Sequence, residues 1–333
     1  MDGTVLITGA NGSLALGFIQ ALLSLHPQVT IIGTVRNTSP EHDSNTAKLL
    51  NLVAGYPKAN FHLEVLDLGN LAGVRSFADQ LADKISSKKL PPISAIICNA
   101  ATFSFEAGQV FTTDGYEATF QVCHLSHYLL ILKLLGSMNK ISGRIVLLGS
   151  VTHYPEKPNP LCSLRPGFPE NMDDLVRPPS DPADLVHDKG FQRYGTAKLA
   201  NVTLAMDLNR RLKEDDQLSG ITALAMDPGG LPSSRAQVGQ KRSARWLFRV
   251  VEFLMPVLKY MTTMFRTVED AGRDLVAVSV GVEFCGKRGY YVGTKEGVPA
   301  AISENRETQE KLWENCWRWA GIRAEETVLR NAS

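Results

Sequence analysis

A tyrosine and a lysine that stand four positions apart could perform acid–base chemistry. In the run Tyr194-Gly-Thr-Ala-Lys198, a helix would place both side chains on one face. Reduction of a carbonyl by hydride needs a proton donor for the developing alkoxide, and a free tyrosine, with a pKa of about 10, is too weak an acid near neutral pH. A fixed ammonium beside it stabilises the phenolate. The pair therefore indicates proton transfer at a carbonyl or an alcohol.

A glycine-rich turn near the start of the chain could bind phosphate. The run TGANGSLALG, residues 8–17, follows an apolar strand-like segment and would open a helix. Its backbone N–H groups and the positive helix end would face a dinucleotide pyrophosphate. The expected cofactor-binding residues of this turn are Gly9, Asn11, Ser13 and Leu14. The same turn could also be only a tight strand-to-helix connection.

The second predicted strand ends in Arg36, and no acidic residue stands there to bind the ribose hydroxyls of NAD. Arg36 would instead pair with the 2′-phosphate of NADP(H), or would be a solvated strand end. Further candidates follow other predicted strands, because ligands of α/β folds bind at the carboxyl ends of the strands. These candidates are Asp67, Leu68, Asn99, Ala100, Ser150, Pro228, Gly229 and Ser233.

Alternating strand-like and helix-like segments would position these residues. Short β-branched runs bounded by turn residues alternate with longer segments of helical period, the pattern of βαβ units. The predicted strands are 5–8, 29–35, 61–66, 93–98, 144–148, 222–225 and 289–292. The predicted helices are 14–25, 71–86, 115–138, 194–213 and 267–280. Seven such strands predict an α/β fold, a Rossmann-type doubly wound parallel sheet.

We expect a single domain over residues 1–325. Eight of the 17 prolines lie between Pro155 and Pro182, which predicts a long irregular insertion, a lid over 151–190. A substrate-side cap is expected over 230–266. Its apolar part, 246–261, is too short and too charged to span a bilayer. It would be a helix over an apolar substrate pocket, or a helix that also makes peripheral contact with a membrane.

Composition narrows the choice of partners. Hydrophobic residues make up 44% of the chain and charged residues 21%, which is typical of a packed globular protein. The net charge of +1 provides no field that would attract nucleic acid. The five scattered cysteines suggest neither a disulfide framework nor a metal site. We therefore expect a cytoplasmic protein, with membrane association through 246–261 as a further option.

The ordered motifs resemble those of the short-chain dehydrogenase/reductase family. The first turn resembles T-G-x-x-x-G-x-G, with Ser13 and Ala15 where the second and third glycines normally stand. The run Cys98-Asn-Ala-Ala resembles the family's N-N-A-G, and Tyr194 with Lys198 matches its Y-x-x-x-K. The order and the length of the tail resemble the retinol-dehydrogenase and protochlorophyllide-reductase branch, and similar proteins occur in fungal natural-product pathways. The resemblance extends from about residue 5 to residue 321.

The resemblance implies a role for each matching residue. Tyr194 would be the general acid/base, Lys198 would also bind the nicotinamide ribose, and Ser150 would orient the substrate oxygen. Asp67 would bond the adenine edge, and Asn99 with Ala100 would pass beneath the adenosine ribose. The Pro228-Gly229 turn would lie beside the nicotinamide, with Ser233 near a cofactor phosphate or the carboxamide. Family members often form homodimers through their long helices, a surface that the insertion and the tail of this chain could block.

The chain departs from the family at one catalytic position. The run Phe120-Gln-Val-Cys-His-Leu resembles F-Q-V-N-H-L, so that Cys123 stands where the family has asparagine. That asparagine anchors a water that links the lysine to solvent, and a thiol is a weak donor and acceptor. Proton resupply would then be slower or rerouted. His124 and His127 are expected to pack or cap.

These features predict an NADP(H)-dependent oxidoreductase that transfers hydride between the nicotinamide and a carbonyl or alcohol of a hydrophobic small molecule, in a biosynthetic pathway. Two alternatives remain open. One is a cofactor-bound sensor or scaffold with little redox activity, suggested by Ser13, Ala15 and Cys123. The other is a non-redox isomerase or cyclase that uses the same pocket.

Overall fold

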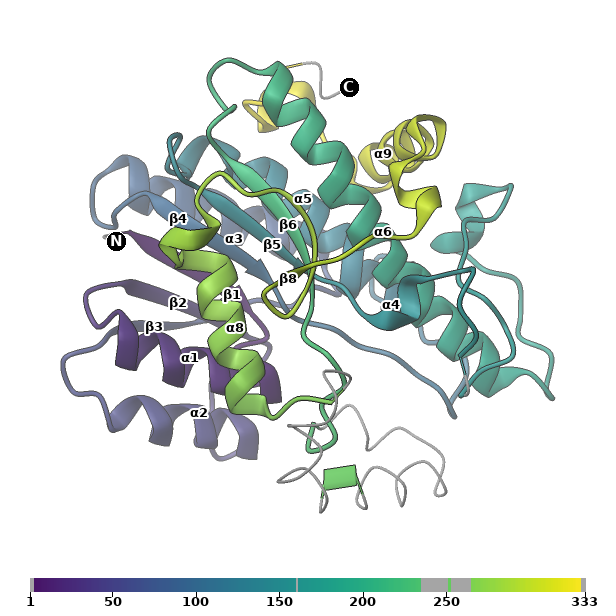
Figure 1. The fold of residues 1–333 in the computed structure, drawn as a ribbon, viewed down its shortest axis with the longest axis horizontal. Helices are drawn as coiled ribbons and strands as arrows, with labels where there is room; N and C mark the ends of the chain where they lie inside the picture. Colours follow the sequence, from purple (N-terminus) through teal and green to yellow (C-terminus); the bar gives the residue numbers. More distant parts are fainter. Residues whose placement is uncertain (1–2, 160, 235–250, 253–264, 331–333) are drawn as a thin grey trace.

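Eight strands form one sheet in the computed structural model, which describes residues 3–159, 161–234, 251–252 and 265–330 (Figure 1). The strand order is β3-β2-β1-β4-β5-β6-β7-β8, parallel from β3 to β7 and antiparallel between β7 and β8. The strands are β1 Thr4–Thr8, β2 Thr30–Val35, β3 Asn60–Val65, β4 Ile93–Cys98, β5 Arg144–Leu148, β6 Thr222–Asp227, β7 Gly289–Val292 and β8 Lys295–Glu296. The Rossmann-type fold is therefore confirmed. The expected count of seven lacked β8, whose two charged residues carry no strand pattern.

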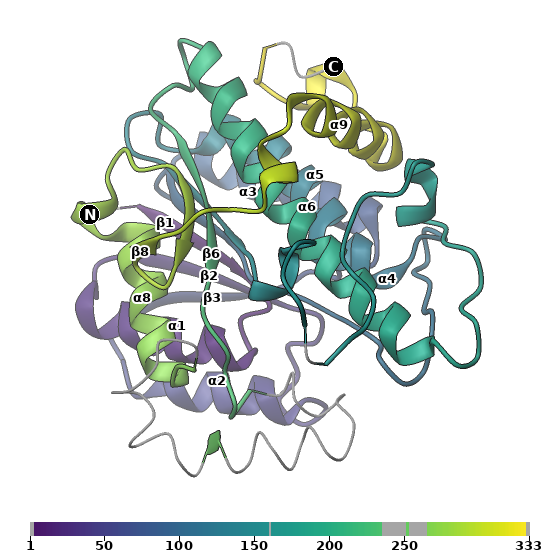
Figure 2. The same ribbon diagram turned by 45° about the vertical axis from the view of Figure 1, so that its right-hand side comes forward.

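Helices cover both faces of this sheet (Figure 2). Helices α1 Ser13–Leu25, α2 Ser44–Ala54 and α8 Val268–Val280 share a hydrophobic core with one face. Helices α3 Leu71–Ser86, α5 Ser126–Leu134, α6 Val186–Glu214 and α9 Arg306–Ala320 share a second core with the other face. Strands β1, β2, β4, β5 and β6 are buried at every residue because both faces are covered, which is why they read as apolar runs.

The strand order reverses between β1 and β4, which are neighbours in the sheet although two strands separate them in the sequence. In open α/β sheets, ligands bind outside the carboxyl ends of the strands at such a point. The turns after β1 and β4, which hold Gly9 and Asn99, both lie at this edge.

Two predicted helices differ from the observed ones. The predicted helix 115–138 is broken into α4 Ala118–Phe120, a π-helical turn η1 Gln121–Leu125, α5, and the short 3-10 turn η2 Leu135–Ser137. The predicted helix 194–213 begins eight residues earlier, at Val186, so Tyr194 lies inside α6 and not at its first turn. Helix α2 was not predicted; Asp43 caps it by accepting from the N–H groups of Asn45 and Thr46.

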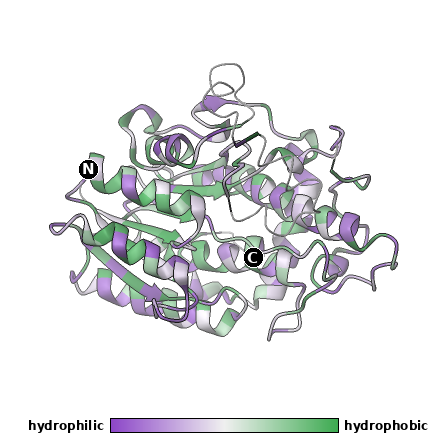
Figure 3. Ribbon diagram, turned by 90° about the horizontal axis from the view of Figure 1, so that it is seen from below, coloured by the Kyte–Doolittle hydropathy of each residue, from purple (hydrophilic) through white to green (hydrophobic). Residues whose placement is uncertain are grey.

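Apolar residues concentrate in the strands, and the helices alternate between apolar and polar residues (Figure 3). Among the described residues, the helical stretch 118–137 is long and apolar enough to cross a membrane, but 83% of it is buried inside the fold. It belongs to the core between α3 and α6. Its apolar character is explained by that position.

The Pro-rich insertion is irregular, as its composition predicts. Between β5 and α6 it contains only the short turns η3 Val151–His153 and η4 Met172–Leu175. Several contacts attach it to helices: among them, Arg193 of α6 makes a two-bonded ion pair with Asp181 at 2.7 and 2.9 Å, and the Trp319 indole of α9 donates to Asp173 at 2.7 Å. The expected lid therefore packs against α6 and α9. The expected cap 230–266, including 246–261, lies almost entirely outside the described residues.

Candidate active site

Ser150, Tyr194 and Lys198 meet where β5 ends beside α6. The Lys198 ammonium donates to the Leu148 carbonyl of β5 at 2.9 Å and lies 5.5 Å from the centre of the Tyr194 ring. Ser150 follows β5 directly, and its hydroxyl is hydrogen-bonded to the Tyr194 phenol. The structure thus brings together the three residues expected to carry the chemistry.

Burial controls the charge of this pair. It raises the pKa of Tyr194, and the nearby Cys123 and Asp227 add to that effect, while the Ser150 hydrogen bond acts in the opposite direction. Burial lowers the pKa of Lys198, which is only 3% exposed. Tyr194 is therefore held as the protonated phenol, the form that can donate to a carbonyl oxygen.

Two glycines of α6 allow two other segments of the chain to approach the helix close to Tyr194. A Cβ at Gly195 would lie 2.7 Å from the Thr152 carbonyl oxygen, and a Cβ at Gly190 would lie 3.1 Å from the Cα of Phe105. Each helix turn that flanks Tyr194 therefore carries a glycine because backbone approaches it closely.

Aromatic rings form a wall beside Tyr194. Phe103 stacks on Phe105 with ring centres 4.6 Å apart, and Phe105 stacks on Phe191 at 4.8 Å. Phe103 also meets the Tyr194 ring edge-on at 5.3 Å. Phe105 and Phe191 are buried with Cys162 of the Pro-rich insertion, against which Leu161 and Leu164 pack. The insertion therefore contributes to an apolar wall at the expected proton donor.

Cys123 lies in the π-helical turn η1 and is 1% exposed. Its thiol donates to the Thr102 carbonyl at 3.3 Å, and it accepts from the Thr102 N–H at 3.4 Å. Burial raises the pKa of this thiol, so it stays neutral near pH 7. The side chain is thus engaged with the loop after β4.

The turn after β1 brings three of the expected cofactor-binding residues to the start of α1. Gly9 has φ +65°, and a Cβ there would lie 3.0 Å from the Cα of Ala100. Gly12 is the N-cap of α1 and makes no side-chain cap, so the positive N-terminal end of the helix lies at this turn. The Asn11 side chain instead donates to Asp43 at 2.9 Å and to Thr46 at 3.1 Å, so it fastens the turn to α2.

Thr8 and His127 support the loop after β4. The Asn99 amide donates to the Thr8 carbonyl at 2.8 Å, and the Thr8 hydroxyl accepts from the N–H groups of Asn99 and Ala100, both at 3.0 Å. The hydroxyl then donates to His127 Nε2 at 2.8 Å, because Nδ1 donates to the Cys123 carbonyl at 3.2 Å. This network holds the two strand ends side by side.

The remaining cofactor candidates occupy the same edge of the sheet. Arg36 follows β2 and is exposed. Asp67 is exposed and accepts from the Gly69 N–H at 2.9 Å, while the buried Leu68 accepts the Ser126 hydroxyl at 2.6 Å. After β6, Pro228 precedes Gly229, which has φ +80°, and Ser233 is exposed.

Sequence reasoning did not assign two residues of this region. Asn201 follows Lys198 by one helical turn, donates to the same Leu148 carbonyl at 3.2 Å and contacts His124 at 3.0 Å. Asp227 ends β6, is 5% exposed, and acts electrostatically on both Tyr194 and Lys198. Its signal in the sequence is a carboxylate that closes an otherwise apolar strand.

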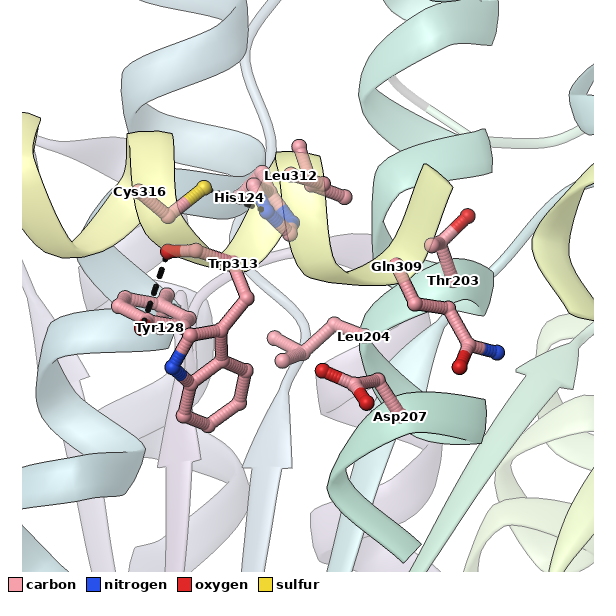
Figure 4. A pocket seen from close by; sticks show the side chains of 9 residues that line it. All are labelled: His124, Tyr128, Thr203, Leu204, Asp207, Gln309, Leu312, Trp313 and Cys316. Atoms are coloured by element: carbon pink, nitrogen blue, oxygen red, sulfur yellow. Dashed lines mark hydrogen bonds between the residues drawn. The ribbon is translucent and has the colours of Figure 1, made fainter. Parts of the chain in front are cut away.

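A small cavity lies away from Tyr194, among α5, α6 and α9 (Figure 4). The Tyr128 hydroxyl donates to the Trp313 carbonyl at 3.4 Å across it. Its lining is His124, Tyr128, Thr203, Leu204, Asp207, Gln309, Leu312, Trp313 and Cys316. None of the expected site residues lines it, so it is a gap in the packing of α9.

Known proteins resemble the chain along its whole length. The pattern of the AcuH dehydrogenase domain matches residues 238–329. Short-chain dehydrogenase iccH of Talaromyces variabilis is 30% identical over 368 residues, with 99% of this chain and 98% of that protein covered. The chloroplastic protochlorophyllide reductase of Cucumis sativus is 28% identical over 340 residues, with 96% and 78% covered.

Solved structures share the fold. The angucycline C-6 ketoreductase LanV with bound NADP superposes with a TM-score of 0.59 at 13% identity, covering 88% of this chain and 95% of that one. The carbonyl reductase Sniffer of D. melanogaster superposes with a TM-score of 0.56 at 18% identity, covering 90% and 100%.

Proposed function

Because the chain belongs to the short-chain dehydrogenase/reductase family, we propose that it transfers hydride between NADP(H) and a carbonyl or alcohol carbon of a hydrophobic, aromatic small molecule, with Tyr194 as the proton donor and acceptor. The observation that carries the proposal is the arrangement of Tyr194, which is hydrogen-bonded to Ser150 and lies one helical turn from the buried Lys198. An alkoxide formed beside Tyr194 would receive its proton from the phenol.

The turn after β1 fits a dinucleotide. The close backbone contact at Gly9 and the positive N-terminal end of α1 would favour a pyrophosphate here, and the exposed Arg36 offers a guanidinium to a 2′-phosphate. Asn99 and Ala100 would lie beneath the adenosine ribose, Asp67 at the adenine, and Gly229 with Ser233 near the nicotinamide. NADPH supplies the hydride when bound. In this arrangement Ser13 replaces a glycine without blocking the turn, and Ala15 is buried in α1.

The wall of Phe103, Phe105 and Phe191 supports the choice of substrate. Stacked rings beside the proton donor favour a flat, apolar molecule over a sugar or a small hydroxy acid. We place the reaction in a natural-product pathway, in keeping with the structural neighbour named as an angucycline ketoreductase. All five cysteines are free thiols, which suits the reducing cytoplasm.

The decisive test is Tyr194→Phe. We expect it to lower kcat for reduction of 9,10-phenanthrenequinone, a flat aromatic diketone, by at least about 100-fold, because the phenol donates the proton. The dissociation constant of NADPH should stay within about two-fold, because the ring remains. Tyr56→Phe, which removes a hydroxyl bound to Ser24 at the surface, is the matched control.

Turnover that survives Tyr194→Phe would refute the assigned proton donor. Loss of NADPH binding in the same variant would mean that the change had damaged the site as a whole. Product formation without loss of NADPH absorbance would favour the isomerase or cyclase alternative. NADPH binding without turnover of any ketone would favour the sensor or scaffold.

A further inference from the structure

A carboxyl group with no assigned role is buried beside the Tyr194–Lys198 pair. Asp227 is the last residue of β6 and is 5% exposed. Side chains alternate along a strand, so Asp227 shares its face with Ala223 and Ala225, which belong to the core under α6. This places its carboxyl on the α6 side of the sheet.

Three donors hold this carboxyl in place. The Gly229 N–H donates to Oδ1 at 2.8 Å, and the Tyr290 hydroxyl lies 3.5 Å from Oδ2. The Val151 N–H also donates to it. Burial raises the pKa of Asp227, while these hydrogen bonds favour its ionised form. A buried carboxylate with three fixed donors has a defined orientation.

The groups around Lys198 identify Asp227 as the source of negative charge. The thiols of Cys98 on β4 and Cys123 on η1 also act on Lys198, but burial raises the pKa of both, so they are neutral near pH 7. Tyr290 of β7, the next group along, is likewise neutral because burial raises its pKa. Asp227 is the carboxyl group among those that act on Lys198 in the described part of the chain. It also lies close by position, because it follows Met226, which pairs with Leu148, and the Leu148 carbonyl accepts from the Lys198 ammonium.

The phenols behind Asp227 lead to the surface. The Tyr290 ring meets the Tyr154 ring edge-on with centres 6.2 Å apart, and the Tyr154 hydroxyl donates to the Val298 carbonyl at 2.6 Å. Val298 is 79% exposed. The carboxyl therefore has two phenols between it and the surface, whereas the Cys123 thiol is engaged with the main chain of Thr102.

We propose that Asp227 is a positioning residue for proton transfer: its carboxylate supplies the negative charge that keeps Lys198 protonated and Tyr194 in its phenol form. The inference rests on the roles proposed above for Tyr194 and Lys198. According to this proposal, the protonation states of Tyr194 and Lys198 are controlled by Asp227 at the end of β6. Cys123, at the position where the family has asparagine, does not control them.

Asp227→Asn tests the proposal because it removes the charge and keeps the shape and an acceptor for the Gly229 N–H. Loss of the negative charge lowers the pKa of both Lys198 and Tyr194. Reduction needs the protonated phenol. In the pH profile of kcat for 9,10-phenanthrenequinone, the decline on the basic side should therefore move to lower pH by about one unit or more. Asp227→Glu retains the charge and should leave the decline of kcat at the same pH as in the wild type.

A second measurement needs no substrate. Lys198 is proposed to bind the nicotinamide ribose, so NADP+ affinity should fall as pH rises and the ammonium is lost. Calorimetry between pH 6 and 10 should show this fall at lower pH in Asp227→Asn than in the wild type. Lys198→Ala should weaken binding at every pH.

The outcomes separate the two claims. If Lys198→Ala leaves NADP+ binding unchanged, the proposed role of Lys198 is wrong. If Lys198→Ala weakens binding but Asp227→Asn moves neither pH profile, the role of Asp227 is wrong. Should Asp227→Asn fail to fold, Asp227→Ser decides: it also removes the charge and keeps an oxygen acceptor for the Gly229 N–H, and a shift in the same direction is expected. An unchanged profile in that variant would overturn the proposal.

Discussion

Three histidines are buried with both ring nitrogens in contact with polar groups. His124 contacts Asn201 and Cys316, His127 contacts Thr8 and Cys123, and His153 accepts from the Ala300 N–H at 3.2 Å. Burial lowers the pKa of His124 and His153 to about 4 and that of His127 to about 3. His124 and His127 were expected to pack, and they do, but His127 also supports the strand ends at the cofactor edge.

These histidines predict a loss of stability in mild acid. In the unfolded chain each would take up a proton near pH 6.5, whereas the folded state resists this until about pH 4 or below. Stability is therefore fully present above pH 6.5 and is lost as pH falls below it. Between pH 7.5 and pH 5, each of these histidines should lower the free energy of unfolding by about 2 kcal/mol.

The measurement is Tm or urea unfolding at a series of pH values. In His127→Gln, the slope of the free energy of unfolding against pH should correspond to about one proton fewer than in the wild type. His62→Gln, at an exposed histidine, is the control for the substitution itself. A wild-type stability that does not change from pH 7.5 to pH 5 would contradict the burial of neutral imidazoles.

At the scale of elements, the contact between α1 and α8 depends on two glycines. A Cβ at Gly272 of α8 would lie 2.6 Å from the Gly17 carbonyl oxygen, and a Cβ at Gly17 would lie 2.9 Å from a methyl carbon of Val268. Gly17 closes the glycine-rich run of the sequence, yet its structural role is helix packing, which sets the position of α1 under the turn at Gly9.

Gly272→Ala should therefore destabilise the protein by about 1–3 kcal/mol, because backbone and not a flexible side chain occupies the space. It should also weaken NADPH binding, since α1 must shift. Gly73→Ala on α3 is the matched control, because its Cβ would meet only Asn70 at an ordinary 3.4 Å. That variant should be neutral or up to about 1 kcal/mol more stable. Equal Tm values for the two variants would refute this account.

The π-helical turn at Gln121–Leu125 shows where local pattern is insufficient. The Ser126 N–H donates to the Gln121 carbonyl, five residues back. The apolar residues on both sides remain in phase with the core, so the sequence predicted one continuous helix. The π-helical turn includes Cys123, whose thiol bonds to Thr102 on another segment of the chain, and a local pattern does not record such a contact.

At the scale of the whole molecule, α9 covers α5 and α6. The Trp313 ring meets Tyr128 edge-on at 5.0 Å, and Arg211 lies over it at 4.0 Å. Glu310 accepts from Arg210 at 2.9 Å. The family resemblance implies pairing through these long helices, and in this chain α9 packs against both of them.

We therefore expect a monomer. Size-exclusion chromatography with light scattering should give a mass near 36.4 kDa that does not change with concentration. Trp313→Ala would loosen α9 and should promote self-association, whereas Trp317→Ala, at a partly buried residue, should have a smaller effect. A wild-type dimer at micromolar concentration would contradict this expectation.

The sequence by itself determined the seven parallel strands, most of the helices between them, the glycine turn and the spacing of Tyr194 and Lys198, because periodicity and short-range spacing carry that information. It did not indicate α2 or β8. Only the tertiary structure decided which distant residues meet: Asp227 beside Lys198, His127 under Thr8, and α9 over α5. It also showed that Asn11 holds α2. Such contacts join positions far apart in the chain, and side-chain packing, which no local pattern records, selects them.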